Sequence, residues 1–198
     1  MRSKPHRTLT TLALAVLRLL REHPMHPYDL HKLIRERATD QVVKVSAGSL
    51  YHTITRLHRL ELVEPVEVGR AGRRPERTVY AITDAGREEY AANLRDLVRW
   101  PEEEYPVFAA AVEMLSSLDA GEAARLLEMR CVSLEARIAA QDQVTAGLTK
   151  RGLSRVSLLE LEYAQSIAQA ELRWVRGVVD DIHSGALTWD HDCKEPMA

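Results

Sequence analysis

The chain has 198 residues, of which 45% are hydrophobic and 28% are charged, a profile typical of one or two folded domains. Charged residues interrupt every apolar run before it reaches the length of a membrane span, and the basic, apolar start shows no small-residue cleavage site. Cys131 and Cys193 form no CxxC pair. We therefore expect a cytoplasmic protein without a disulfide, a metal or a cofactor.

The charge is divided unequally along the sequence. Residues 1–90 carry a net charge of +5 and six of the eight histidines, whereas residues 91–198 carry −7. A basic segment joined to an acidic one indicates a polyanion-binding module followed by a module of another kind. The imbalance is modest, however, and by itself it also fits chance.

Three helices are predicted in the first part of the chain. Residues 8–22 place apolar side chains on one face at helical spacing, and Pro27 begins a second helix that runs to about Ala38. The stretch TDQVVKV is then interpreted as a short linker. Ser46 caps a third helix, which ends near residues 60–62.

A β-hairpin with a basic tip is predicted next. The runs LVEPVEVG and RTVYAIT flank a turn rich in glycine and arginine. Thr83 then caps a fourth helix that runs to about Arg99, and Trp100-Pro101 marks a domain boundary.

The order of three helices and a basic hairpin is that of a winged helix-turn-helix, and it predicts DNA binding. The polar face of the third helix would enter the major groove. The candidate residues are Ser46, Gly48 and Ser49 for phosphate, Tyr51, His52, Thr55 and Arg56 for sugar, phosphate and base edges, and Arg70, Arg73, Arg74 and Arg77 on the wing for the backbone or the minor groove. Each feature alone also fits a solvated surface; their ordered combination favours DNA.

Residues 105–185 are predicted to form long antiparallel helices. Their apolar stripes leave one face of the pair unburied, so a second copy of the chain is the expected partner. The candidate interface residues are Leu127, Leu134, Ile138, Ile167, Trp174 and Val178. The alternative is a monomer whose long helices close on the winged domain. We therefore expect a mainly α protein with a winged helix-turn-helix over residues 1–100, a helical dimerisation or effector domain over residues 101–185, and a flexible tail over residues 186–198.

The large aromatic side chains suggest an effector cleft. Trp100, Tyr105, Phe108 and Trp174 would line such a cleft between domains or protomers; the alternative is that they are core and interface anchors. The sequence contains no phosphate loop, no GxSxG and no HExxH motif, so an enzyme is not expected.

Four segments also carry a resemblance to a known family. They are LALAVLRLL, PYDLHKLI, SAGSLYHTITRLHRLELVEP and RRPERTVYAITDAGREEY, within about residues 9–90, and ELRWV adds a weaker likeness near the C-terminus. In these segments the chain resembles the PadR-like transcriptional regulators. The resemblance implies a homodimeric repressor at an inverted-repeat operator, with a small aromatic effector in some members. It also implies that Ser46, Gly48, Ser49, Tyr51 and His52 lie near DNA, with Arg73, Arg74 and Arg77 on the wing.

Two positions depart from the family pattern. Pro27 stands where the family usually has glycine before Tyr-Asp-Leu, and Glu61 stands where it usually has glycine ahead of Leu-Val. Glu61 must therefore adopt a left-handed conformation, or the third helix must end differently. Two other functions stay open: a protein-interaction adaptor without duplex affinity, and a small-molecule sensor whose winged domain transmits the signal.

Overall fold

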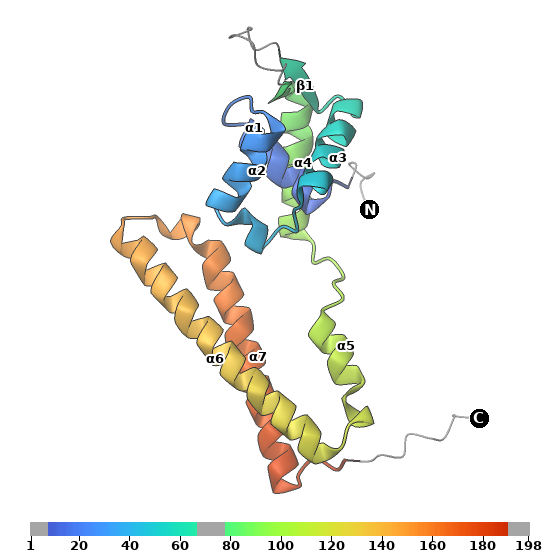
Figure 1. Cartoon of the computed structure of the whole chain (residues 1–198), viewed down its shortest axis with the longest axis vertical. Coiled ribbons are helices and arrows are strands. Elements are labelled where there is room, and N and C mark those ends of the chain that lie inside the picture. Colours follow the sequence, from blue (N-terminus) through green and yellow to red (C-terminus); the bar gives the residue numbers. More distant parts are fainter. Residues whose placement is uncertain (1–7, 67–77, 190–198) are drawn as a thin grey trace, which may run out of the picture. The chain divides into compact units, whose positions relative to one another are not determined.

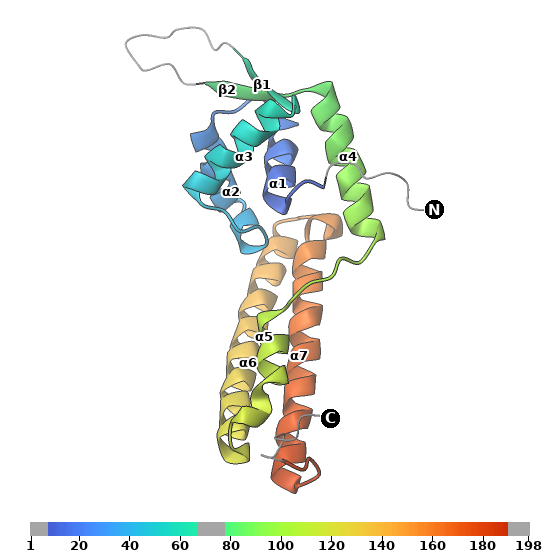
Figure 2. The same ribbon diagram turned by 90° about the vertical axis from the view of Figure 1, so that its right-hand side faces the viewer.

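The computed structural model describes residues 8–66 and 78–189 and is mainly helical, as predicted (Figures 1 and 2). The chain divides into two compact units, Met1–Glu103 and Glu104–Ala198. The first contains α1 (Thr11–Leu20), α2 (Pro27–Glu36), α3 (Ala47–Arg59), β1 (Val63–Val66), β2 (Val79–Ile82) and α4 (Asp84–Arg99). The second contains α5 (Val107–Glu113), α6 (Ala120–Lys150) and α7 (Leu159–Ser184). Within the described ranges, no helix is long and apolar enough to cross a bilayer.

Helix α1 is the core element of the first unit. The Thr10 hydroxyl caps it by accepting a hydrogen bond from the Ala13 backbone N–H at 3.2 Å. Eight of its ten residues are buried, so the helix is apolar on nearly every side and must be enclosed. Helices α2, α3 and α4 and strand β2 all contact it.

A buried asparagine ties the start of α1 to α4. The Asn93 Oδ1 accepts a hydrogen bond from the Leu9 backbone N–H at 2.9 Å, and its Nδ2 donates to the Glu89 carbonyl at 2.9 Å. Both ends of the buried amide are therefore satisfied. Nearby, the Arg21 guanidinium lies 5.0 Å from the centre of the Tyr90 ring.

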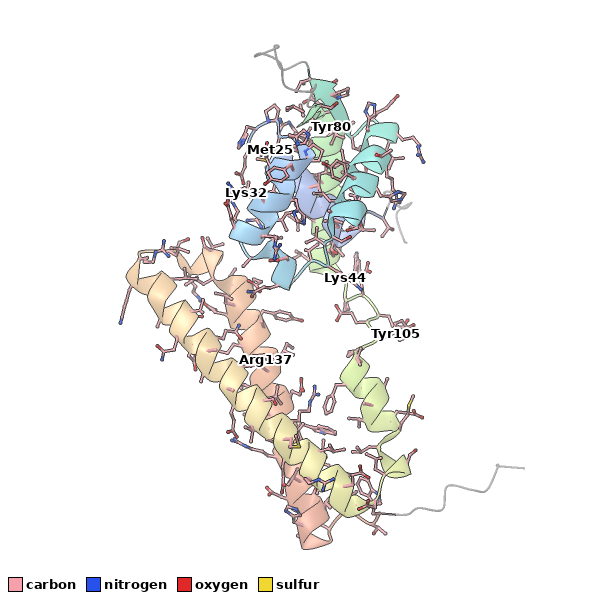
Figure 3. All side chains as sticks on the ribbon, viewed as in Figure 1. Met25, Lys32, Lys44, Tyr80, Tyr105 and Arg137 are labelled. Atoms are coloured by element: carbon pink, nitrogen blue, oxygen red, sulfur yellow. The ribbon has the colours of Figure 1, made fainter. Side chains whose placement is uncertain are left out.

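The two strands pair antiparallel, and β2 also pairs with the loop before α2. Tyr80 exchanges backbone hydrogen bonds of 3.0 and 2.9 Å with Met25, and Figure 3 labels the two residues close together. Pro65 lies opposite Tyr80 in the hairpin. The backbone N–H and carbonyl of Tyr80 bond to Met25 and not to Pro65. The lack of an N–H in Pro65 therefore leaves no backbone group of Tyr80 unpaired. From the sequence, only a break in the helical pattern is evident at the Met25 loop.

Helix α3 ends at a left-handed residue. Glu61 has a φ of 60°, and its N–H bonds to the His58 carbonyl while the Leu62 N–H bonds to the Leu57 carbonyl, the Schellman pattern. The Thr83 hydroxyl donates to the Glu61 carbonyl at 2.8 Å. Of the two alternatives raised by the sequence, the chain therefore adopts the left-handed one, and it leads directly into β1.

Helices α6 and α7 pack together along the second unit. Their shared core consists of Leu127, Cys131, Leu134, Leu172, Val175 and Val179. Burial raises the pKa of the Cys131 thiol, which keeps it protonated and apolar in character. Across the pair, the Arg176 guanidinium donates to the Glu135 carboxylate at 2.5 Å.

One helix boundary differs from the sequence prediction, and two other segments show detail that the sequence did not predict. Helix α2 ends at Glu36 and not at Ala38, because Ala38 is left-handed with a φ of 54°. The predicted linker begins with a 3-10 turn over Thr39–Gln41. In the segment expected to be a flexible tail, the Trp189 indole N–H donates to the Leu118 carbonyl at 2.8 Å; residues 190–198 lie outside the described residues.

Gly86, in the first turn of α4, gives the first testable prediction. A Cβ there would lie 2.1 Å from the Leu62 carbonyl oxygen, so Gly86→Ala must displace backbone. We expect it to destabilise the first unit by about 2–3 kcal/mol. The control is Gly147→Ala in α6, where no atom lies within 4 Å of the added carbon and helix propensity favours alanine by about 1 kcal/mol. Urea unfolding followed by circular dichroism compares the two variants, and equal stability would contradict the packing of α4 described above.

Candidate nucleic-acid interface

Helix α3 has one buried face and one exposed face. Leu50, Ile54 and Leu57 are at most 2% exposed and pack into the core of the first unit. At 100° per residue, the opposite side of the helix carries a line of exposed residues with spacings of four, three and four. This line, which we name the α3 ridge, consists of Gly48, His52, Thr55 and Arg59. Helix α3 contains no Asp or Glu, so its exposed face is uniformly neutral or basic.

The two serines at the start of α3 bond to each other. The Ser49 N–H donates to the Ser46 Oγ at 3.1 Å, and the Ser46 N–H donates to the Ser49 Oγ at 2.9 Å, a reciprocal capping box. Within the described part of the chain, the N–H groups of Ala47 and Gly48 have no partner, as the first turn of a helix requires. The serines therefore hold the helix end, and the free donors at this end are backbone groups.

Gly48 has no structural requirement for glycine. It is exposed in the second position of α3, and a Cβ added to it would have no atom within 4 Å. Glycine also costs about 1 kcal/mol relative to alanine in a helix. A residue that lowers helix stability without a packing reason is consistent with close approach of another molecule to the backbone.

The remaining polar residues of α3 differ in whether their side chains already have a hydrogen-bond partner. Tyr51 is 51% exposed, and its carbonyl accepts a hydrogen bond from the Thr55 hydroxyl at 3.0 Å. The Thr55 hydroxyl therefore bonds to its own helix. His52 and Arg56 are exposed, and their side chains have no polar partner among residues 8–66 and 78–189.

The second histidine of α3 has a structural role. The His58 Nδ1 lies 3.1 Å from the Val63 carbonyl oxygen, and its ring packs edge-on against Tyr80 at 6.1 Å between centroids. These contacts join the end of α3 to the hairpin. Of the two histidines in the helix, only His52 is available to a ligand.

Sequence reasoning missed two cations beside these residues. Arg59 completes the α3 ridge, and the spacing from Gly48 would have identified it. Lys44 lies in the segment that leads into α3 and is labelled in Figure 3. Both residues are exposed, and neither has an ion pair with any residue that the structure describes.

The predicted wing tip lies outside the described residues. This applies to Arg70, Arg73, Arg74 and Arg77, whereas β1 and β2 on either side are in place. Contact of these arginines with DNA stays a prediction.

The residues predicted for the dimer interface divide into two groups. Leu127 and Leu134 are 3% and 4% exposed inside the α6–α7 core, and Ile138 and Val178 pack against it. Ile167 and Trp174 are 49% and 47% exposed on α7. Ile167 and Trp174 are therefore accessible to a second molecule, whereas the residues of the first group pack within the α6–α7 pair.

The four aromatic residues predicted for an effector cleft differ from one another in their surroundings. Phe108 and Trp174 pack edge to face with 6.2 Å between ring centroids, and the Arg130 guanidinium lies 3.4 Å from the centre of the Phe108 ring. Trp100 and Tyr105 are 61% and 85% exposed. Within the second unit, Phe108 and Trp174 are therefore brought together. No group of three or more metal-ligating side chains occurs in the described ranges.

The first unit matches a known family of transcription factors. Residues 16–92 match the model of the transcriptional regulator PadR-like family, which covers α2, α3, the hairpin, most of α4 and part of α1. A search of curated protein sequences gives no match.

Solved structures share the fold of nearly the whole chain. Bacillus subtilis PadR in complex with operator DNA has 21% identity and a TM-score of 0.70, and the match covers 86% of this chain and 98% of that one. The same protein in complex with p-coumaric acid has 20% identity and a TM-score of 0.72, with 87% and 98% covered. The Vibrio cholerae virulence activator AphA has 19% identity and a TM-score of 0.67, with 88% and 99% covered.

These findings agree with the residues that prompted the resemblance. The matched segment contains the whole of α3 and both strands of the wing, and the family consists of regulators and not of enzymes. Residues 16–92 therefore match the PadR-like family of transcriptional regulators, and the solved PadR structures share the fold of the chain.

Proposed function

We propose that the chain is a homodimeric repressor that binds an inverted-repeat operator and is released from it by a small aromatic effector. The observation that carries the proposal is the exposed face of α3. It combines two free backbone donors at the helix start with His52, Arg56 and Arg59, and α3 has no acidic residue to repel phosphate.

Duplex DNA fits the dimensions and chemistry of this face. The major groove is about 12 Å wide and admits an α-helix of about 10–12 Å diameter. Phosphate can bind the free N–H groups of Ala47 and Gly48, where the helix dipole also favours an anion. His52 and Arg56 can then donate to base edges, with guanine N7 and O6 as the best acceptors for an arginine.

A homodimer is supported by the outer side of α7. Leu159, Tyr163, Ile167 and Trp174 recur there at helical spacing, and each is between 47% and 70% exposed. An apolar stripe of this kind marks an interaction site. Two copies would present two α3 helices to half-sites about one helical turn apart, which multiplies the affinity of a single winged helix.

The proposals of repression and of an aromatic effector are based on the resemblance to the family and on the solved relatives. Repression is what the family resemblance implies, although the Vibrio cholerae relative is named as an activator. Bacillus subtilis PadR has been solved with p-coumaric acid. In this chain, the packed Phe108–Trp174 pair and the exposed rings of Trp100 and Tyr105 offer aromatic faces on which such a ligand can stack.

Binding to duplex DNA tests the proposal as a whole. Fluorescence anisotropy with DNA from upstream of the chain's own gene should show tight, salt-dependent binding that exceeds binding to a scrambled duplex. Addition of p-coumaric acid should lower the affinity. Tyr51→Ala should weaken binding by about tenfold or more, since loss of one phosphate or sugar contact costs roughly 1–3 kcal/mol. Absence of binding at low salt would favour the adaptor.

Gly48→Ala separates folding from DNA binding. Because the added methyl group meets no atom of the chain, we expect unfolding stability to be unchanged or raised by up to about 1 kcal/mol. Operator affinity should fall, because the methyl group would hold phosphate away from the free N–H groups. Unchanged affinity in this variant would show that DNA does not approach the start of α3 closely.

The oligomeric state tests the α7 stripe. Ile167→Glu places a charge on the stripe and should convert the dimer to a monomer in sedimentation velocity, with circular dichroism unchanged. Gln169→Glu is the control, because Gln169 is exposed on a different side of the same helix. A dimer that survives Ile167→Glu would place the interface elsewhere.

A further inference from the structure

We propose that Lys44 and Arg59 are phosphate contacts at the two ends of α3 and that His52, between them, is a base-reading position that sets operator preference. This inference rests on the proposed function and adds two residues to it. It is carried by the placement of these side chains and by their lack of any partner among the residues that the structure describes.

Lys44 lies in the segment that leads into α3. Val43 and Val45 are partly buried and pack against the core of the first unit. Lys44 stands between these two packed valines, and it is exposed. It lies two residues before Ser46, which caps α3. The lysine thus precedes the helix start, where an anion is already favoured.

Arg59 is the last residue of α3 and the end of the α3 ridge. The buried face of the helix fixes its direction, since Leu50, Ile54 and Leu57 lie on the opposite side. Acidic residues follow at Glu61 and Glu64, yet neither forms an ion pair with Arg59 within the described residues. The folded chain therefore leaves this guanidinium without an anionic partner in that part of the structure.

Two other cations of the protein, Arg37 and Arg155, are used differently. Arg37 bonds to Glu22 with 2.8 Å between Nη2 and Oε2, and this contact lowers the pKa of the Glu22 carboxyl. Arg155 pairs with Glu162 at 3.0 Å. Unlike these pairs, Lys44 and Arg59 carry positive charge that no described residue balances, and both lie next to the helix that carries the proposed contact face.

The separation of the two cations suits phosphate contact. The 12 steps from Ala47 to Arg59 cover roughly 18 Å along the helix at about 1.5 Å each, and Lys44 lies three residues before Ala47. This span exceeds the major groove width of about 12 Å. The ends of α3 therefore reach the phosphate walls of the groove, while the middle of the ridge faces its floor.

His52 lies in that middle region. It is exposed on the ridge, four residues after Gly48 and seven before Arg59, and its side chain has no polar partner among the described residues. An imidazole offers a donor and an acceptor and can distinguish base edges in the major groove. The neighbouring Thr55 hydroxyl is already bonded to Tyr51. His52 is thus the ridge residue best able to read a base.

The salt dependence of binding separates phosphate contacts from base contacts. The full-length protein, Lys44→Gln, Arg59→Gln and His52→Ala are titrated with duplex from upstream of the gene over a salt series. Lys44→Gln and Arg59→Gln should each reduce the slope of log K against log salt by about one unit and weaken all operator variants to a similar extent. His52→Ala should leave the slope nearly unchanged and should alter the ranking of duplexes with single base-pair changes.

A matched control is Arg95→Gln. Arg95 is an exposed cation on α4, and Figure 2 shows α1 between α4 and α3 in the first unit. Its replacement should not change the slope. If Lys44→Gln and Arg59→Gln both keep the wild-type slope while the wild-type protein binds DNA, the inference is overturned and the proposed function stands. Absence of binding by the wild-type protein would overturn both.

Discussion

The burial of Leu50, Ile54 and Leu57 is the constraint on which the account depends. These side chains pack into the core around α1, and this packing fixes the rotation of α3 about its own axis. Once the rotation is fixed, the residues on the opposite side are fixed too, and they form the α3 ridge. A rotation by one residue would turn His52 and Arg59 by about 100°. The core of the first unit therefore selects the surface that α3 exposes.

Local contacts at both ends of α3 keep this surface in place. The capping box of Ser46 and Ser49 fixes the start of the helix, and the left-handed Glu61 ends it. The contact of His58 with Val63 and Tyr80 then ties its last turn to the hairpin. Together these features fix both ends of a helix of 13 residues.

Much of this organisation was predictable from the sequence. Helical periodicity and the capping residues Ser46 and Thr83 identified the helices, and the family pattern identified Glu61 as a strained position. The pairing of Met25 with Tyr80 was not predictable, because a single bridge has no periodic signal. Lys44 was missed because its exposure between two packed valines is evident only in the folded chain. Arg59 was missed although its spacing was visible.

Helices α6 and α7 do not bury all of their apolar side chains against each other. Helices α6 and α7 use one face each to bury Leu127, Leu172 and Val175. The outer side of α7 still exposes Tyr163, Ile167 and Trp174. Buried and exposed apolar residues therefore occur along the same helix, and sequence periodicity alone merged them into a single set. The exposed fractions of the side chains separate the two groups.

Chemical protection of guanine N7 would test the central claim most directly, namely that α3 enters the major groove. Dimethyl sulfate methylates guanine N7 in the major groove and adenine N3 in the minor groove. We predict that bound protein protects guanine N7 at two positions about one helical turn apart, as two α3 helices require. Binding without any protection of guanine N7, or with protection of adenine N3 alone, would contradict the account.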